Sequence, residues 1–140
     1  MIKITKESSV SIDDVLHLYQ AVGWTNYTNQ PQMLEKALSH SLATYLARDD
    51  EEIVGLVRLV GDGFSSVFVQ DLIVLPSYQR QGIGSNLMKE ALADYKDAYQ
   101  IQLATEQTEK TLGFYRSLGF ESLSTYDCTG MIWVDRKNLQ

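Results

Sequence analysis

One stretch near the middle of this 140-residue chain restricts its fold more than any other. It is a nearly continuous apolar run, Val67 to Leu75, followed by Pro76, a loop with two glycines, and apolar residues at helical spacing from Ile83 to Tyr95. A continuous apolar run that ends at a proline predicts a central strand buried on both faces. The stretch therefore predicts a strand, a loop and a helix in direct succession.

The residues around this unit predict further strands and helices. A helix is expected from Ser11, a good N-cap residue with acidic residues after it, to Gly23. The other expected helices are Pro31–Ser39 and Thr111–Leu118. The expected strands are Ile2–Thr5, Thr44–Arg48, Ile53–Val60 and Ile101–Thr105, with a closing hairpin formed by Ser122–Thr125 and Met131–Val134. This order predicts one α+β domain over residues 1–140, built around a mixed sheet.

The overall charge limits the classes of partner. The net charge of −6 disfavours nucleic acid, whose binding depends on many Lys and Arg contacts to phosphate. It suits a cationic substrate such as an amine, or simply keeps the protein soluble. Cys128 is the single cysteine, and neither a signal peptide nor an apolar run of membrane-spanning length is recognised, which predicts no membrane association and a cytoplasmic location.

The loop from Gln79 to Ser85 is typical of an anion site at a helix start. The first amides of a helix point outward without internal partners, and the helix dipole makes this end positive. Gly82 and Gly84 let a phosphate approach the backbone, and Arg80 can add a charged contact.

Several interpretations of the loop compete. A dinucleotide site needs a third glycine, and Leu87 stands at that position. A nucleoside triphosphate loop needs a G-x-x-x-x-G-K-[ST] run, which the chain lacks. The diphosphate of coenzyme A and an ordinary strand–helix turn both remain open at this point.

Two motifs resemble one superfamily, the GCN5-related N-acetyltransferases (GNAT). Gln79-x-x-Gly82-x-Gly84 after a strand resembles its acetyl-CoA motif, and residues 113–120, GFYRSLGF, resemble the end of its later helix. The resemblance covers essentially the whole chain and implies a mixed, mostly antiparallel central sheet flanked by helices. Shorter segments resemble the arylalkylamine (serotonin-type) branch, namely Gly23-Trp24, residues 55–58, residues 71–74 and residues 130–133.

The resemblance implies acetyl-CoA as acyl donor and an amine, on a small molecule or a protein, as acceptor. The central strand would separate from its neighbour at a bulge and pair with the pantetheine arm through Leu72, Ile73 and Val74, which are also candidates for plain core residues. The diphosphate would lie on the loop, whose candidate residues are Gln79, Arg80, Gln81, Gly82, Ile83, Gly84 and Ser85. Family members commonly form dimers, so a homodimer is a possible assembly.

The resemblance also implies catalytic residues. Tyr115 matches the general acid that protonates the departing thiolate, although a tyrosine packed on an apolar helix face would look the same. Asp71, a carboxylate within an apolar strand, is the candidate base, or else makes a structural hydrogen bond. Glu106 is a weaker candidate. The family's Asn before the tyrosine helix is missing, and Gln107 is the possible substitute.

Trp24 and Tyr27 lie in an aperiodic segment where family members shape the acceptor site, and packing in the core is the equal alternative. His17 and His40 have no second ligand at metal spacing, so no metal is expected. An N-acetyltransferase is the leading hypothesis. A non-catalytic acyl-CoA-binding or partner-binding module of the same fold and a dinucleotide-dependent oxidoreductase are the alternatives.

Overall fold

The computed structural model describes residues 1–135 and forms two compact units. The first unit is Met1–Leu103, and the second begins at Ala104. The strands of the described chain all lie in the first unit: β1 (Ile2–Glu7), β2 (Ala43–Asp49), β3 (Glu52–Gly61), β4 (Ser66–Val74) and β5 (Gln100–Leu103). The helices of the first unit are α1 (Ile12–Ala21), α2 (Thr25–Thr28), α3 (Pro31–Ser39), the 3-10 helix η1 (Pro76–Tyr78) and α4 (Ile83–Asp94). The second unit contains α5 (Glu109–Ser117) and the 3-10 helix η2 (Leu123–Tyr126).

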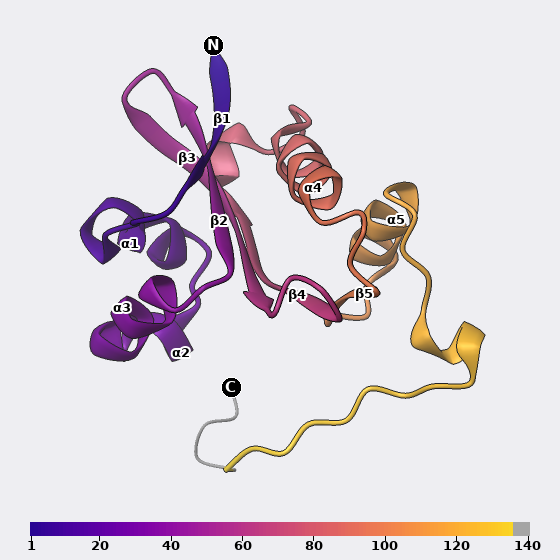
Figure 1. Cartoon of the computed structure of the whole chain (residues 1–140). Helices are drawn as coiled ribbons and strands as arrows, with labels where there is room; N and C mark the ends of the chain where they lie inside the picture. The colour runs from indigo at the N-terminus through magenta and orange to yellow at the C-terminus, as the bar shows by residue number, and fades with distance from the viewer. Residues whose placement is uncertain (136–140) are drawn as a thin grey trace. The chain divides into compact units, whose positions relative to one another are not determined.

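The strands form one mixed sheet in the order β1-β2-β3-β4-β5. Strands β1 to β4 are antiparallel neighbours, and β5 is parallel to β4. The long α4 crossover between β4 and β5 makes this parallel pair possible, since parallel strands need a connection that returns the chain to the same end. The predicted α+β fold with a mixed, mostly antiparallel sheet is confirmed (Figure 1).

Helices cover both faces of the sheet. On one face, α1, α2 and α3 bury Leu18, Tyr19 and Leu34 against Leu56 and Ile73 of the sheet. On the other face lies α4, and a Cβ placed on Gly55 of β3 would stand 3.2 Å from Leu87 Cδ1 of α4 (Figure 1). A larger side chain at position 55 would therefore push α4 away from the sheet.

Local signals position the first helices as predicted. The Ser11 side chain accepts a hydrogen bond from the Asp13 amide and caps α1, and Pro31 is the first residue of α3. The segment between them, which has no clear period in the sequence, forms the four-residue helix α2. This helix is too short to show a repeat, and the burial of Tyr27 fixes it.

Strand β4 corrects one prediction. It was expected to be buried on both faces, whereas buried residues alternate with half-buried or exposed ones along it. The buried residues are Val67, Val69, Asp71 and Ile73. Successive side chains of a strand point to opposite faces of the sheet, so the alternation shows that β4 is covered less completely at every second residue.

The predicted C-terminal hairpin is wrong for the described residues. Ser122 caps η2 with its hydroxyl, so the first expected strand is a 3-10 turn. Residues 127–135 after it contain no helix or strand. Short Ser- and Thr-containing segments can satisfy their backbone by such local side-chain hydrogen bonds, which compete with strand pairing.

Candidate active site

A bulge in β4 opens the edge of the sheet. Arg58 of β3 pairs with Asp71, but the next residue, Leu59, pairs with Val69, so Gln70 is an extra residue in β4. The parallel pairing with β5 stops at the same place, at Val69 and Leu103. Among the described residues, no strand therefore pairs with the second half of β4 on that side, as the resemblance implied.

Backbone direction decides which groups face this open edge. The Leu75 amide donates to the Val54 carbonyl of β3 at 2.9 Å. Because successive residues of a strand point their N–H and C=O groups to opposite sides, Ile73 also faces β3, whereas Leu72 and Val74 face the open edge. Of the three residues expected to meet the pantetheine arm, Leu72 and Val74 thus present backbone groups there, and Ile73 contributes a buried side chain.

The glycine loop directly follows this edge. Gly82 is the N-cap of α4 with φ +80°, a left-handed conformation that glycine adopts without strain, and no side chain caps this helix end. The first turn closes when the Asn86 amide donates to the Gly82 carbonyl at 3.0 Å. The preceding amides, of Ile83, Gly84 and Ser85, lie in the first turn, where a helix provides no acceptor.

The conformation before the helix is strained. Arg80 has φ +66°, which is uncommon for a residue with a side chain. The Arg80, Gln81 and Gly82 residues are all exposed, so the loop is accessible to a ligand. The structure thus brings together, in one unit, every predicted loop residue and the open edge of β4.

Two contacts fix the start of the loop. The Gln79 side chain donates through Nε2 to the Val74 carbonyl at 3.1 Å, which ties the loop to the open edge. The Tyr78 hydroxyl donates to Asp49 Oδ2 at 2.8 Å. This hydrogen bond to Asp49, together with burial, raises the pKa of Tyr78 to about 12, so the hydroxyl remains a donor at neutral pH.

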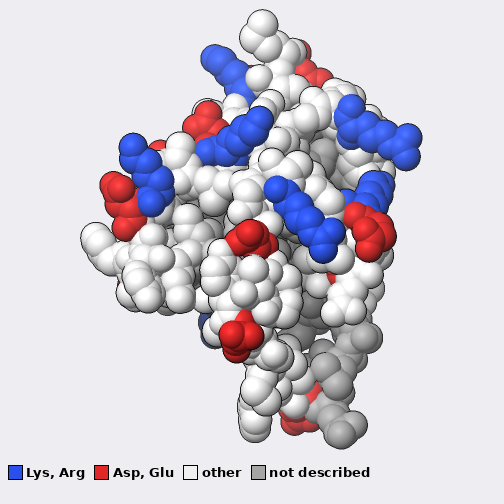
Figure 2. Space-filling model, turned by 90° about the vertical axis from the view of Figure 1, so that its right-hand side faces the viewer, with Lys and Arg blue, Asp and Glu red and all other residues white. Residues whose placement is uncertain are grey.

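Charge is distributed without one dominant patch on the face shown in Figure 2. Lys and Arg side chains stand apart from one another there, with Asp and Glu side chains among them. Within the loop itself, Arg80 is the basic side chain, and the backbone amides at the start of α4 lie at the positive end of the helix dipole.

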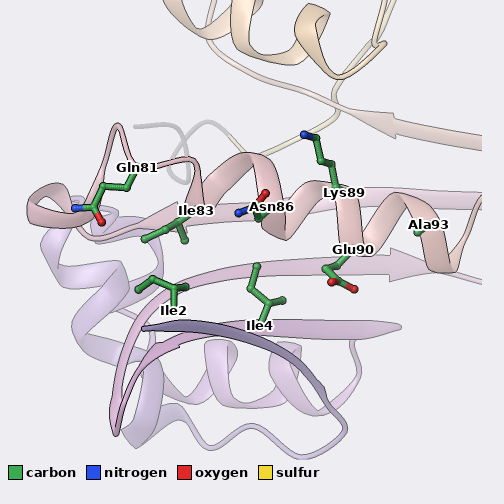
Figure 3. Close-up of a pocket in the computed structure, with 8 residues that line it drawn as sticks. All are labelled: Ile2, Ile4, Gln81, Ile83, Asn86, Lys89, Glu90 and Ala93. Atoms are coloured by element: carbon green, nitrogen blue, oxygen red, sulfur yellow. The ribbon is translucent and has the colours of Figure 1, made fainter.

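A pocket of about 440 Å³ lies beside the loop, between β1 and α4 (Figure 3). Ile2 and Ile4 of β1 form one wall, and Asn86 and Glu90 of α4 stand opposite them. Gln81 belongs both to this pocket and to the loop. Leu72 and Val74 do not line it, so the pocket is separate from the open edge of β4.

Asp71 lies in a buried polar cluster under the bulge. Its Oδ2 accepts from Arg58 Nε at 2.7 Å and from the Tyr19 hydroxyl at 2.8 Å, and its Oδ1 accepts from the Tyr27 hydroxyl at 2.8 Å. Asp71 and Arg58 are 2% and 3% exposed. Both carboxylate oxygens are occupied by protein donors, which matches the structural alternative for Asp71 better than the general-base role.

The two tyrosines of this cluster are held as neutral donors. Burial, reinforced by the nearby Asp71 carboxylate, raises the pKa of both Tyr19 and Tyr27 above the ordinary tyrosine value. Gln70, the bulge residue, also donates through Nε2 to the Tyr27 hydroxyl at 3.4 Å. The cluster therefore ties α1 and α2 to the point where β4 leaves β5.

Trp24 and Tyr27 occupy different environments. Tyr27 is buried and directs its hydroxyl to Asp71, so its side chain belongs to the core. Trp24 is half-buried at the start of α2, with its ring 6.1 Å from Tyr19 and 6.2 Å from Tyr27. Of the two acceptor-site candidates, Trp24 keeps a surface that a ligand can reach.

Tyr115 lies on α5, in the second unit. Its ring packs edge-on against Phe114 and Phe120, 5.0 and 5.9 Å between ring centroids. Burial raises the pKa of its hydroxyl, which keeps it protonated at neutral pH. Glu106 precedes this helix and accepts from the Thr111 hydroxyl at 3.2 Å, and Gln107 is exposed.

Sequence reasoning missed two members of the buried cluster, Arg58 and Tyr19. The signal for Arg58 was present, because an arginine inside a run of β-branched residues needs a buried partner, just as Asp71 does. Tyr19 was recognised only as part of the apolar stripe of α1. Its hydroxyl partner lies 52 residues away, and no local pattern indicates it.

The structure also bears on metal binding and on membrane-spanning helices. Within residues 1–135, no three His, Cys, Asp or Glu side chains lie together as a metal-binding group. None of the helices described in this range has the length and apolar character that crossing a membrane requires.

Comparison with solved structures agrees with this architecture. An acetyltransferase of the GNAT family from Streptococcus pneumoniae superposes with a TM-score of 0.90 at 74% identity, covering 97% of this chain and 99% of that one. A GNAT family acetyltransferase from Elizabethkingia anophelis, solved with acetyl-CoA bound, has a TM-score of 0.64 at 22% identity, covering 86% of this chain and 76% of that one.

Two curated relatives align with this chain over part of their length. GCN5-related N-acetyltransferase 1 of Arabidopsis thaliana, a chloroplastic protein, is 29% identical over 91% of this chain. Serotonin N-acetyltransferase 2 of Oryza sativa, also chloroplastic, is 33% identical over 65% of it. The chain spans 64% and 48% of the length of these two relatives.

A family model described as an acetyltransferase (GNAT) domain matches residues 40–122, which include the bulge, the loop, α4 and the Tyr115 helix. This match covers more than half of the chain. The chain therefore belongs to the GNAT family of acetyltransferases.

Proposed function

We propose that this protein transfers the acetyl group of acetyl-CoA to a primary amine by direct attack of the amine on the thioester. The observation that carries the proposal is the continuity of two binding surfaces. After the open edge of β4 at Leu72 and Val74, the chain passes through η1 and the glycine loop to the amides at the start of α4.

These surfaces fit the two parts of coenzyme A. The pantetheine arm contains amide groups, and Leu72 and Val74 offer backbone groups that can pair with them as an added strand would. The diphosphate is an anion, and the amides of Ile83, Gly84 and Ser85 meet it at the positive end of the helix dipole. The related protein from Elizabethkingia anophelis, which has acetyl-CoA bound, supports the same donor here.

The chemistry needs one bond to form and one to break. The cationic amine first loses a proton to solvent, and its neutral nitrogen then attacks the thioester carbonyl carbon. The carbon–sulfur bond breaks, the nitrogen loses a second proton to solvent, and the group that protonates the thiolate regains its proton from solvent. We assign the protonation of the departing thiolate to Tyr115, on the strength of the motif at residues 113–120. Asp71 takes no part in this scheme, because Arg58, Tyr19 and Tyr27 occupy its oxygens.

The acceptor is proposed to be an amine that is cationic in solution. The net charge of −6 favours the approach of a cation, and the half-buried Trp24 offers an aromatic surface. The relative from Oryza sativa is named a serotonin acetyltransferase, so arylalkylamines belong in the test panel. The proposal places the reaction in the cytoplasm, because Cys128 is a free, exposed thiol of the kind that a reducing compartment preserves.

Calorimetric titration with acetyl-CoA tests the donor, with NADH as the control. We expect saturable one-site binding of acetyl-CoA and none of NADH. A panel of small amines and lysine peptides, followed by release of free thiol, then identifies the acceptor. Absence of acetyl-CoA binding would refute the proposal, and binding without thiol release from any amine would refute the catalytic part.

A further inference from the structure

Gln70, the extra residue of the β4 bulge, points to the same face of the sheet as its neighbour Asp71. Successive residues of a regular strand point to opposite faces, and a bulge interrupts this alternation. Both side chains reach the hydroxyl of Tyr27 on α2, with Gln70 Nε2 at 3.4 Å and Asp71 Oδ1 at 2.8 Å. Asp71 is buried, whereas Gln70 is exposed. The bulge therefore adds an exposed amide to the buried polar cluster, within the first unit of the chain.

The hydrogen bonds of Tyr27 fix the orientation of this amide. A tyrosine hydroxyl has one O–H to donate and two lone pairs that accept. Tyr27 donates to Asp71, and burial raises its pKa, so the hydroxyl keeps its hydrogen at neutral pH. Its two lone pairs accept from Arg58 Nη2 at 3.3 Å and from Gln70 Nε2. The nitrogen of the Gln70 amide thus faces Tyr27, and its carbonyl oxygen Oε1 has no donor among residues 1–135.

The position of Gln70 along β4 matches the reactive end of the acyl donor, an argument that rests on the function proposed above. In the proposed complex, the diphosphate lies at the start of α4, which follows β4 in the chain. The pantetheine arm then runs back along the open edge, past Val74 and Leu72, toward the bulge. The thioester therefore arrives at the end of the open edge where Gln70 lies.

A glutamine carbonyl suits an attacking amine. The lone pair of the neutral amine must point at the thioester carbon, so its N–H groups are free to bond to acceptors on the enzyme. Oε1 of Gln70 is such an acceptor, and an amide does not take up a proton near neutral pH. It can therefore orient the amine, while the protons of the amine pass to solvent.

We propose that Gln70 is an acceptor-binding residue, whose Oε1 accepts a hydrogen bond from the amine nitrogen of the substrate at the β4 bulge. Tyr27 holds the amide through Nε2, and Asp71 holds Tyr27 in turn. The buried cluster thus positions the amine without any proton transfer to Asp71. Trp24, whose ring is 6.2 Å from that of Tyr27, lies on the same tyrosine and offers a surface for the rest of an aromatic amine.

Steady-state kinetics with the acceptor amine tests the proposal. Gln70→Leu removes both ends of the amide, and the KM for the amine should rise about 10- to 100-fold, the loss expected for a hydrogen bond to a charged group. The affinity for acetyl-CoA and the midpoint of thermal unfolding should stay the same. Gln100→Leu, an exposed glutamine of β5, is the matched control and should leave all three quantities unchanged.

Gln70→Glu separates amine binding from a structural role. A carboxylate keeps an acceptor oxygen for the amine but cannot donate to Tyr27. We expect the KM for a cationic amine to stay near the wild-type value or to fall below it. A purely structural role depends on the Nε2 donor alone, and Gln70→Glu would then raise the KM as much as Gln70→Leu does. That result would overturn the proposal.

Two further outcomes distinguish this inference from the proposed function. A wild-type protein that acetylates the amine, together with a Gln70→Leu variant of unchanged KM, would overturn the role of Gln70 and leave the acetyltransferase activity standing. A wild-type protein that transfers no acetyl group to any amine would refute the proposed function, and the role of Gln70 with it.

Discussion

Arg58 and Asp71 form a buried ion pair across the β3–β4 ladder, with Arg58 Nε 2.7 Å from Asp71 Oδ2. They pair at the register position next to the bulge where β4 loses its β5 neighbour. The pair therefore holds together the strand segment whose open edge follows. We expect the pair to stabilise the conformation of β4 at the bulge.

Asp71→Asn tests this structural role. The change keeps the size of the side chain but leaves the Arg58 guanidinium buried without a carboxylate. We expect the free energy of unfolding, measured in urea, to fall by about 3–5 kcal/mol. Arg48→Met is the matched control, since the Arg48–Glu7 pair of β2 and β1 is partly exposed and should contribute only about 0–1 kcal/mol. An Asp71→Asn protein with wild-type stability but no turnover would instead restore Asp71 as the base.

Gly82→Asp tests the anion site. The new carboxylate would repel a diphosphate at the helix start, and acetyl-CoA binding measured by calorimetry should be lost. Gly23→Asp is the control, because Gly23 has a similar φ of +72° and, like Gly82, open space around its Cβ position. It carries the same backbone strain at the end of α1. Equal acetyl-CoA affinity in the two variants would count against the loop assignment.

Tyr78→Phe tests the anchoring of the loop. Loss of the hydroxyl removes the hydrogen bond to Asp49, so the loop should become less ordered and acetyl-CoA should bind several-fold more weakly. The anchor needs a protonated hydroxyl, and a pKa of about 12 means that it persists at neutral pH and is lost only as the pH rises through that value. Tyr99→Phe, an exposed tyrosine before β5, should leave the affinity unchanged. An unchanged acetyl-CoA affinity in Tyr78→Phe would show that the loop keeps its conformation without this hydrogen bond.

Tyr115→Phe tests proton donation. With an acceptor amine identified, kcat should fall about 10²–10⁴-fold while acetyl-CoA affinity stays the same. Burial raises the pKa of Tyr115, so the wild-type rate should decline only above the ordinary tyrosine value of about 10, where the donor loses its proton. The Phe variant should lack this decline. Tyr126→Phe, an exposed tyrosine of the second unit, serves as control, and an unchanged kcat in Tyr115→Phe would remove the residue from the mechanism.

Local patterns predicted much of this molecule. Ser11 and Pro31 mark the starts of α1 and α3 because a cap and a first-turn proline act within a few residues of themselves. The glycines of the loop predicted its position before α4, since the left-handed conformation at Gly82 is a property of that one residue. The same local features carry the family resemblance.

Sequence patterns gave wrong predictions where the structure of a segment depends on residues far away in the chain. The apolar run of β4 predicted burial on both faces, but how completely each face of β4 is covered depends on the elements that pack against it, which the residues of β4 do not specify. The strand-like composition of residues 131–134 predicted a hairpin, yet the expected partner closes into η2 instead.

The sequence by itself thus predicted most of the order of elements up to Leu118, the position of the glycine loop before α4, and the family. Only the tertiary structure decided that Asp71 is enclosed by Arg58, Tyr19 and Tyr27, and that Leu72 and Val74, but not Ile73, face the open edge. The physical reason is the separation along the chain over which each kind of interaction acts. Capping, turn conformation and periodicity act between near neighbours in the chain, whereas burial and strand pairing depend on residues that folding brings together from distant positions.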